Sequence, residues 1–268
     1  MELSDKVAVV TGGAGGIGNA LARRFAREGA RGVAIADLNA SGAEDAAAAI
    51  GSQAIGMGCD VTDEAQVGDL IARAEEAFGP VDLFCANAGI AVGTELDSPD
   101  EVWDQIFAVN FRAHVVAARR LVPAWLERGE GYFLSTASAA GLVSQIGSAP
   151  YAVTKHAAVA FAEWLAITYG GRGIRVSCLC PMGVNTAMLN AGLEVEGGEG
   201  LGSRVVAAAG AVLEPDEVAA VVVEGLRDER FLILPHPEVL EFFRRKGSDY
   251  DRWIAGMQRL QSRVMGTP

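Results

Sequence analysis

The segment Thr11-Gly12-Gly13-Ala14-Gly15-Gly16-Ile17-Gly18 decides how this chain folds. It follows the apolar run Val7-Ala8-Val9-Val10, which is typical of a buried strand, and precedes an amphipathic pattern over 17–28 that predicts a helix. Glycines at such a junction let the backbone turn tightly and approach phosphate groups, while the helix N-terminus offers free N–H groups. A glycine-rich turn alone is a weak signal, but this position between strand and helix predicts a dinucleotide-binding turn.

The alternation of apolar strands and helices continues along the whole chain. Continuous apolar strands separated by helices indicate a parallel sheet covered on both faces. We therefore expect an α/β, Rossmann-type doubly wound sheet of about seven strands in a single domain, 1–268, with a cofactor half over about 1–135 and a catalytic and substrate half over about 136–268. Further strands are expected at 33–36, 53–57, 81–85, 131–135, 174–179 and 231–234, and helices at 41–50, 64–78, 101–128 (with a break at Pro123 left open), 150–170 and 215–226, followed by one C-terminal helix.

The segment 187–210 departs from this pattern because it is rich in Gly and Glu. Its glycines suggest a mobile lid that closes over a pocket. A disordered surface insertion fits the same composition, so both interpretations stay open.

Composition restricts the class of partner. The chain has 268 residues and a net charge of −12, and its acidic residues are scattered, which argues against a nucleic-acid or anionic membrane surface. The sequence holds no run near the ~18 apolar residues of a membrane span. Its start lacks the basic residues of a secretory signal, and we expect a cytoplasmic protein. We interpret the basic cluster Arg244-Arg245-Lys246 as a solvated helix face.

The cysteines and histidines do not predict a metal site. Cys178 and Cys180 are two residues apart on an expected strand, so their thiols share one face rather than form a zinc knuckle. The three histidines, His114, His156 and His236, show no ligand spacing.

Asp37 ends the second expected strand, about twenty residues after the glycines. A carboxylate there can accept hydrogen bonds from the adenosine ribose and would repel a 2′-phosphate. Leu38 and Asn39 bring no positive charge to neutralise such a phosphate, which favours NAD over NADP. The alternative is an Asp that caps the next helix.

Tyr151 and Lys155 lie four residues apart at the start of an expected helix, so their side chains share one face. A phenol has an ordinary pKa of about 10, and a nearby cation lowers it toward the working range of a proton-transfer group. The alternative is a core tyrosine beside a solvated lysine. With four tyrosines and three lysines in the chain, the pair alone is a modest signal.

These motifs together resemble the short-chain dehydrogenase/reductase family. Gly12, Gly16 and Gly18 fit its T-G-x-x-x-G-x-G pattern, and Tyr151-x-x-x-Lys155 fits its catalytic pair, over a similarity that runs from Lys6 to about residue 235. The resemblance implies an NAD(P)-dependent oxidoreductase that interconverts an alcohol and a carbonyl. It also implies a homo-oligomer, a tetramer or a dimer.

The resemblance assigns two further catalytic residues. Ser138 lies thirteen residues before Tyr151 and would hydrogen-bond the reacting oxygen, whereas Ser135 and Thr136 are neighbours that could instead satisfy backbone groups. Asn110 would hold a water that links Lys155 to solvent. A buried Asn that only satisfies backbone is the alternative for Asn110.

The resemblance also implies a set of cofactor-binding residues and shows two departures. Ala86 stands where the family has the first Asn of N-N-A-G, and Met182 replaces the glycine of P-G-x-V-x-T. The implied cofactor-binding residues are Gly12, Gly15, Gly16, Ile17, Gly18, Asp37, Leu38, Asp60, Val61, Asn87, Ala88, Gly89, Tyr151, Lys155, Pro181, Gly183, Val184 and Thr186.

Most residues expected near the substrate are apolar, although the same residues could be core. No Arg or Lys is expected among them, so we predict a neutral, fairly hydrophobic secondary alcohol or its ketone. Two other functions remain: an NADP-dependent carbonyl reductase, and a dinucleotide-binding regulator without catalysis, against which the intact set of catalytic residues argues. The expected pocket residues are Ile90, Ala91, Val92, Ala139, Leu142, Val143, Gln145, Met182, Met188 and Leu189.

Overall fold

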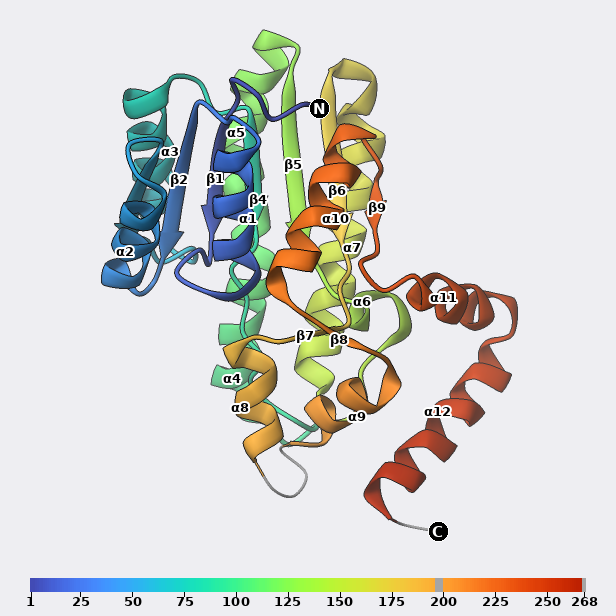
Figure 1. The fold of residues 1–268 in the computed structure, drawn as a ribbon. Coiled ribbons are helices and arrows are strands. Elements are labelled where there is room, and N and C mark those ends of the chain that lie inside the picture. The colour runs from blue at the N-terminus through green and yellow to red at the C-terminus, as the bar shows by residue number, and fades with distance from the viewer. Residues whose placement is uncertain (196–199, 267–268) are drawn as a thin grey trace.

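A parallel sheet of seven strands forms the centre of the described chain, in the order β3-β2-β1-β4-β5-β6-β9 (Figure 1). The computed structural model describes residues 1–195 and 200–266. The strand order reverses between β1 and β4, which opens a crevice at the carboxyl ends of the strands. The predicted doubly wound Rossmann-type fold is confirmed. The strands are β1 (Val7–Thr11), β2 (Gly32–Asp37), β3 (Ala54–Gly58), β4 (Leu83–Ala86), β5 (Gly131–Thr136), β6 (Ile174–Leu179) and β9 (Leu232–Ile233).

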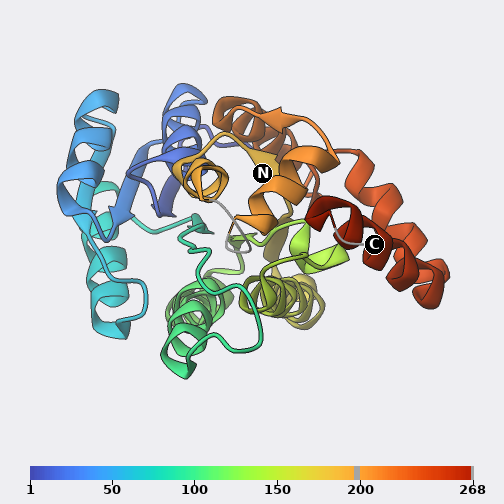
Figure 2. The same cartoon turned by 90° about the horizontal axis from the view of Figure 1, so that it is seen from below.

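Helices cover both faces because successive side chains of each strand point to opposite sides. On β1, Val7 and Val9 pack into one hydrophobic cluster, and Ala8 and Val10 pack into the other. The helices α3 (Glu64–Phe78), α5 (Ala113–Arg128) and α7 (Ala149–Tyr169) cover the first face. The helices α1 (Gly16–Arg27), α2 (Ala40–Ile50) and α10 (Pro215–Arg227) cover the second, and Figure 2 shows the two layers from below.

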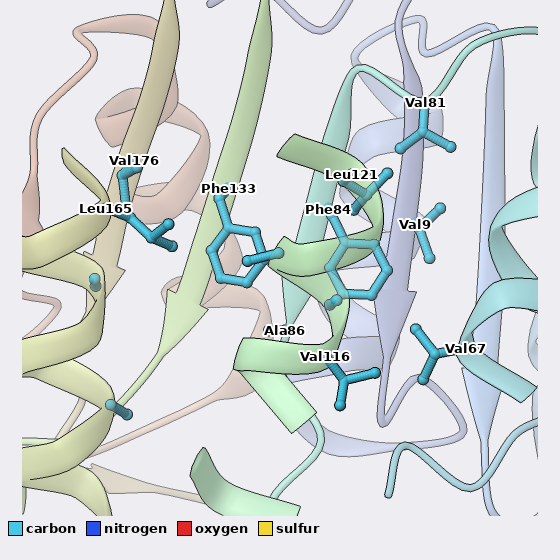
Figure 3. Close-up of a cluster of buried hydrophobic side chains, with 14 of the residues drawn as sticks. Val9, Val67, Val81, Phe84, Ala86, Val116, Leu121, Phe133, Leu165 and Val176 are labelled. Atoms are coloured by element: carbon cyan, nitrogen blue, oxygen red, sulfur yellow. The ribbon is translucent and has the colours of Figure 1, made fainter. Parts of the chain in front are cut away.

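The cluster under α5 is built around two phenylalanines on adjacent strands. Phe84 of β4 and Phe133 of β5 stack with their ring centroids 6.0 Å apart, and Figure 3 shows Val116 and Leu121 of α5 in the same cluster. Burial of each such ring contributes about 1.5–3 kcal/mol. This packing fixes β4 and β5, whose carboxyl ends carry candidate site residues.

The expected long helix differs from the prediction in where it is irregular. It does not break at Pro123, which lies inside α5, because a proline removes only one backbone hydrogen bond and the buried Trp125 anchors this turn by donating from Nε1 to the Val81 carbonyl at 2.8 Å. The irregularity comes earlier, in the π-helical turn Ala108–Arg112 between α4 (Asp100–Phe107) and α5. Asn110 lies in this wider turn. Single π-turns within helices are often found at functional sites.

Further elements gather beyond the carboxyl ends of the strands, below the sheet in Figure 1. These are α6 (Ala140–Val143), β7 (Gly183–Val184), α8 (Ala187–Glu194), α9 (Leu201–Ala209) and β8 (Val212–Leu213), with β7 paired to β8. The described parts of 187–210 are therefore two helices rather than an irregular insertion. The glycines expected to make this segment mobile, Gly197 and Gly198, lie outside the described residues.

Two helices, rather than the one expected, end the chain. They are α11 (Glu238–Ser248) and α12 (Tyr250–Met265), and they separate at Asp249, whose extended backbone and carboxylate cap α12 by accepting from the Arg252 N–H at 3.0 Å. α12 runs away from the sheet toward α9 (Figure 1), and its Met257 and Leu260 pack with Leu201. Within the two described stretches, no helix is long and apolar enough to cross a membrane.

Candidate active site

The glycine-rich turn needs glycine at its three patterned positions. Gly12 and Gly16 have φ of +66° and +52°, the left-handed region that other residues rarely adopt. A Cβ on Gly18 would lie 2.1 Å from the Gly12 carbonyl oxygen, and one on Gly12 would lie 2.8 Å from the Cα of Ala88. The turn is therefore held by backbone packed directly on backbone.

The start of α1 is suited to bind a phosphate group. Its N-cap is Gly15, and among the described residues no side chain caps its first turn, whereas Asn39 and Asp63 cap α2 and α3. A Cβ on Gly15 would meet no atom within 4 Å, so the space in front of these N–H groups is open. Uncapped N–H groups at a positive helix end fit a pyrophosphate, and the residues present fit a dinucleotide.

Thr11 and Asn87 connect the turn to β4. The Thr11 hydroxyl donates to the Cys85 carbonyl at 3.2 Å and accepts from the N–H groups of Asn87 and Ala88. The Asn87 amide donates to the Thr11 carbonyl at 3.0 Å. Asn87 and Ala88 thus shape the turn together with Thr11, whose bonding role its place in the sequence pattern does not reveal.

The carboxylates of Asp37 and Asp60 lie at the carboxyl ends of β2 and β3. Asp37 accepts from the Ala14 N–H and from the Asn39 N–H, both at 3.0 Å. Because Asn39 caps α2, Asp37 is not the helix cap that was the alternative. Asp60 accepts from the N–H and the hydroxyl of Thr62, which fixes its carboxylate beside the same crevice.

Three further residues of the expected cofactor-binding set, Ile17, Leu38 and Val61, are apolar. Val61 is buried, Ile17 packs partly buried against the second hydrophobic cluster, and Leu38 is 78% exposed at the crevice edge. An exposed leucine after Asp37 offers an apolar surface where a flat base can lie. None of these three side chains brings a positive charge that could neutralise a 2′-phosphate.

Tyr151 and Lys155 lie on the first turns of α7 as predicted, and Ser138 follows β5. The Lys155 Nζ is 5.6 Å from the centre of the Tyr151 ring and donates to the Thr136 carbonyl at 3.0 Å. The Ser138 hydroxyl accepts from the Ala140 N–H at 3.1 Å and donates to the Pro181 carbonyl at 3.4 Å. The structure therefore brings the three side chains together at the crevice.

Burial governs the protonation of this pair. It raises the pKa of Tyr151, while a hydrogen bond with Ser138 opposes the rise. It also lowers the pKa of Lys155 to about 8. The expectation that Lys155 lowers the pKa of Tyr151 is not met in this structure, because the ammonium is directed to the Thr136 carbonyl and burial of the phenol dominates.

Asn110 lies next to Lys155, separated from it by the backbone of Gly89. A Cβ on Gly89 would lie 3.3 Å from Asn110 Oδ1 and 3.4 Å from Lys155 Nζ. The fully buried Asn110 accepts from the Ile90 N–H at 2.8 Å and donates to the Ile90 carbonyl at 2.9 Å. Asn110 therefore satisfies loop backbone and also borders the lysine, so both interpretations of this residue remain.

Ser135 and Thr136, the two alternatives to Ser138, have hydrogen-bond partners away from Tyr151. Ser135 pairs with His114 Nδ1 at 3.0 Å inside the core, and the Thr136 hydroxyl donates to Asn87 Oδ1 at 3.2 Å. His114 Nε2 has no hydrogen-bond partner among the described residues, and burial lowers the pKa of this imidazole to about 3. Of the three hydroxyls, Ser138 is the one beside Tyr151.

With this geometry established, the chain can be compared with known proteins. Residues 6–196 match the family model described as short chain dehydrogenase. The chain belongs to the short-chain dehydrogenase family. It is an oxidoreductase that acts on hydroxyl or ketone substrates.

Relatives cover from two thirds to nearly the whole of this dehydrogenase. It is 39% identical over 262 residues to 1-deoxy-11-beta-hydroxypentalenate dehydrogenase of Streptomyces exfoliatus, a match that covers 95% of this chain and 92% of that protein. It is 39% identical to 2-(S)-hydroxypropyl-CoM dehydrogenase 3 of Xanthobacter autotrophicus, over 67% of this chain and 72% of that one. A Burkholderia phymatum short chain dehydrogenase/reductase solved in complex with NAD has a TM-score of 0.85 at 31% identity, covering 94% and 96% of the two chains.

The segment after β6 lies across the crevice of the dehydrogenase. The Pro181 carbonyl accepts from the Ala139 N–H at 2.8 Å, and Gly183 and Val184 form β7. Thr186 caps α8, and its Cγ2 would lie 3.1 Å from a Cβ on Gly16. This contact brings the segment against the glycine-rich turn.

His236 hydrogen-bonds the backbone of this segment, a role that was not predicted from the sequence. Its Nδ1 accepts from the Met182 N–H at 3.1 Å, and its Nε2 donates to the carbonyls of Gly183 and Ala211 at 3.0 and 3.2 Å. A lone histidine on a loop gives no local signal for such contacts. His236 is a positioning residue because it acts through Met182 and Gly183.

A cavity of about 780 Å³ adjoins the catalytic groups between α6, α9 and α12. Ala139, Val143, Gln145 and Met182 line it, as expected for pocket residues. The prediction that no Arg or Lys lies near the pocket is wrong, because the folded-back C-terminal helices bring arginines to it from more than 100 residues beyond Ser138. These are Arg245, Arg252 and Arg259.

Proposed function

We propose that this dehydrogenase uses NAD to interconvert a hydrophobic secondary alcohol and its ketone, with Tyr151 as the general acid and base. The observation that carries the proposal is the meeting of Ser138, Tyr151 and Lys155 at the crevice that the glycine-rich turn also borders. A nicotinamide cofactor bound there supplies the hydride acceptor or donor.

Each side chain has a distinct task in the proposed mechanism. In oxidation the Tyr151 oxygen takes the proton of the alcohol, and in reduction the neutral phenol returns it. Ser138 hydrogen-bonds the same oxygen and stabilises the charge that develops on it. Lys155 would hold the ribose side of the cofactor, and Asn110 would hold a water that links Lys155 to solvent and relays the proton.

The roles of the remaining cofactor-binding residues are proposed from their places around the crevice. Gly12, Gly15, Gly16, Ile17 and Gly18 would face the pyrophosphate, and Asp60 with Val61 the adenine. Asn87, Ala88 and Gly89 would border the cofactor. Val184 and Thr186 would position its carboxamide, with Pro181 and Gly183 beside them in the same segment. In this arrangement residues of about 1–135 bind the cofactor, and the rest of one domain carries catalysis and substrate binding.

The preference for NAD rests on Asp37. Its carboxylate accepts two backbone hydrogen bonds at the end of β2, so it is fixed where a 2′-phosphate would meet it. The double variant Asp37→Ala with Leu38→Arg removes that charge and adds a cation, and we expect a marked shift of kcat/KM toward NADP. An unchanged preference would support the NADP-dependent reductase instead.

The first test of the whole proposal is NADH formation from NAD across a panel of secondary alcohols. Tyr151→Phe should lose turnover by about 10²–10⁴-fold while still binding NADH. Tyr169→Phe, at the far end of the same helix, is the matched control. Tight NADH binding without turnover on any alcohol or ketone would favour a binding-only regulator.

Two sequence-based predictions stay predictions: a cytoplasmic location and a homo-oligomer. The predicted neutral character of the substrate depended on the absence of cations at the pocket. The arginines of α11 and α12 remove that premise.

A further inference from the structure

The cavity beside the catalytic centre has walls of two kinds. Toward the sheet and α9 its lining is apolar, with Val143, Ile146, Met182, Val205 and Val206. The C-terminal helices add both apolar side chains, among them Trp253, Met257 and Leu260, and charged ones, three arginines and one aspartate. A substrate that extends from Tyr151 into this cavity would meet apolar side chains on both sides, and arginines where α11 and α12 form the wall.

The cavity lies beside the catalytic segment, because residues next to Ser138 and Pro181 along the chain line it, although the side chains of Ser138, Tyr151 and Lys155 do not. Ala139 and Met182 line it, and they directly follow Ser138 and Pro181. Ser138 and Ala139 both donate to the Pro181 carbonyl, so the two lining residues are held side by side. A substrate oxygen at Ser138 would therefore place the adjoining carbon skeleton at this end of the cavity.

Arg252 and Arg259 are arranged to act together. They are seven residues apart on α12, which is two helical turns, so they share one face. Gly256 lies between them, and a Cβ there would be 3.7 Å from Nη2 of Arg259. The Arg259 guanidinium therefore lies back along the helix, beside Gly256, and both residues line the cavity.

The charges of these two arginines are not neutralised within the described chain. Arg245 forms an ion pair with Glu241 at 2.8 Å, and the carboxylate of Asp249 accepts from the backbone at the start of α12. No described residue forms an ion pair or hydrogen bond with the Arg252 or Arg259 side chain. In a protein of net charge −12, two unpaired guanidinium groups at one cavity wall form a local site for an anion.

We propose that this cavity binds the far end of the substrate and that Arg252 and Arg259 bind a carboxylate carried there. The inference rests on the proposed function and sharpens it: the substrate is a hydrophobic secondary alcohol with an anionic group distant from the hydroxyl. Guanidinium groups suit this task because they bind carboxylates with paired, charge-assisted hydrogen bonds.

Binding of two rigid probes tests the site without turnover. Adamantane-1-carboxylate and adamantane-1-methanol have the same apolar cage and differ in charge. Their binding to the full-length protein can be measured, with and without NADH, by calorimetry and by the fluorescence of Trp253, which lines the cavity. We expect the carboxylate to bind about tenfold more tightly or better.

Matched variants assign the preference to the arginines. The double variant Arg252→Gln with Arg259→Gln should abolish the preference for the carboxylate, and Arg263→Gln, on the same helix but outside the cavity lining, should retain it. Equal binding of both probes by the unmodified protein would overturn the inference, as would an equal loss in the Arg263→Gln control.

Turnover separates this inference from the proposed function. With 9-hydroxydecanoate and its methyl ester as substrates, the double variant should raise KM for the acid and narrow its advantage in kcat/KM. Turnover without any preference for an anion would overturn the arginine site alone. A preference for the carboxylate probe without turnover on any alcohol or ketone would overturn the proposed oxidoreductase and leave the site intact.

Discussion

At the glycine-rich turn, side chains are hydrogen-bonded to neighbouring backbone, whereas on α12 two arginine side chains have no partner among the described residues. Thr11 and Asn87 use their side chains on neighbouring backbone, and the Gly12 carbonyl lies against Gly18. On α12, Arg252 and Arg259 have no such partner within the described chain. The glycine-rich turn is covered by the sheet and its helices, but α12 packs only on the peripheral cluster of Ile146, Leu201 and Val205 among the described hydrophobic clusters.

This difference separates two kinds of function. A cofactor crevice must present the same atoms in every turnover, and tight backbone packing holds them in place. A substrate wall on peripheral helices can change without disturbing the sheet, because few buried groups depend on it. We therefore expect changes at the glycine-rich turn to affect folding and cofactor binding, and changes on α12 to affect substrate choice.

The largest expected effect is at Lys155, where catalysis and stability should separate. Lys155→Met should lower kcat by about 10²–10⁴-fold, because the charge beside Tyr151 is lost. Its Tm should stay the same or rise, because a buried ammonium is costly. The pKa of Lys155 in the fold, about 8, lies below its ordinary 10.5, so the charged form disfavours folding.

The pH dependence of this stability follows from the sign of the shift. Below about pH 8 both folded and unfolded chains carry the charge, and the gain in Tm from Lys155→Met should be complete. From pH 8 toward 10.5 the folded chain sheds the proton first, so the gain should shrink. Calorimetric scans at several pH values measure it, and a lower Tm at pH 7 would contradict the expectation.

The next largest effect compares two glycines of the same turn. Gly18→Ala should cost about 3 kcal/mol or more and lower Tm by about 6–12 °C, because its Cβ would lie 2.1 Å from the Gly12 carbonyl. Gly15→Ala has extended backbone and open space, so it should leave Tm unchanged. Equal Tm values for the two variants would show that the turn is not held by backbone packing.

The pH profile of turnover should show a smaller change. The raised pKa of Tyr151 keeps the phenol protonated near neutral pH, which suits proton donation in reduction. Oxidation needs the phenolate, so its rate should rise with pH, by at most about tenfold per unit below that pKa. Initial rates in both directions from pH 6 to 10 measure this, and an oxidation rate that falls with pH would contradict it.

The smallest effect tests how α11 is attached to the active-site helix. Lys246 donates to the Leu142 carbonyl at 2.7 Å and lies 3.2 Å from His156 Nε2, so it is not the solvated residue expected from its basic cluster. Lys246→Met should cost about 1 kcal/mol in unfolding free energy. The neighbouring exposed Arg244→Met should cost less, and denaturant titrations of both variants give the comparison.

Much of the fold was predictable because its signals are local. Continuous apolar runs marked the strands, and the helix 64–78 was placed at its observed bounds. The turn at Ala108–Arg112 was not predicted, because a π-turn depends on packing around Asn110 rather than on a residue type. The break between α11 and α12 was missed for a related reason, since Asp249 acts through its backbone conformation.

The sequence alone determined the alternation of elements, the glycine-rich turn, and the spacing that sets Tyr151 beside Lys155, because these depend on neighbours along the chain. Only the tertiary structure decided which distant residues meet. It brought His236 to the backbone of Met182, directed Lys155 to the Thr136 carbonyl, and placed Arg252 and Arg259 at the cavity. Such contacts join residues tens to hundreds of positions apart, and no local pattern encodes them, because they are fixed by the packing of whole helices on the sheet.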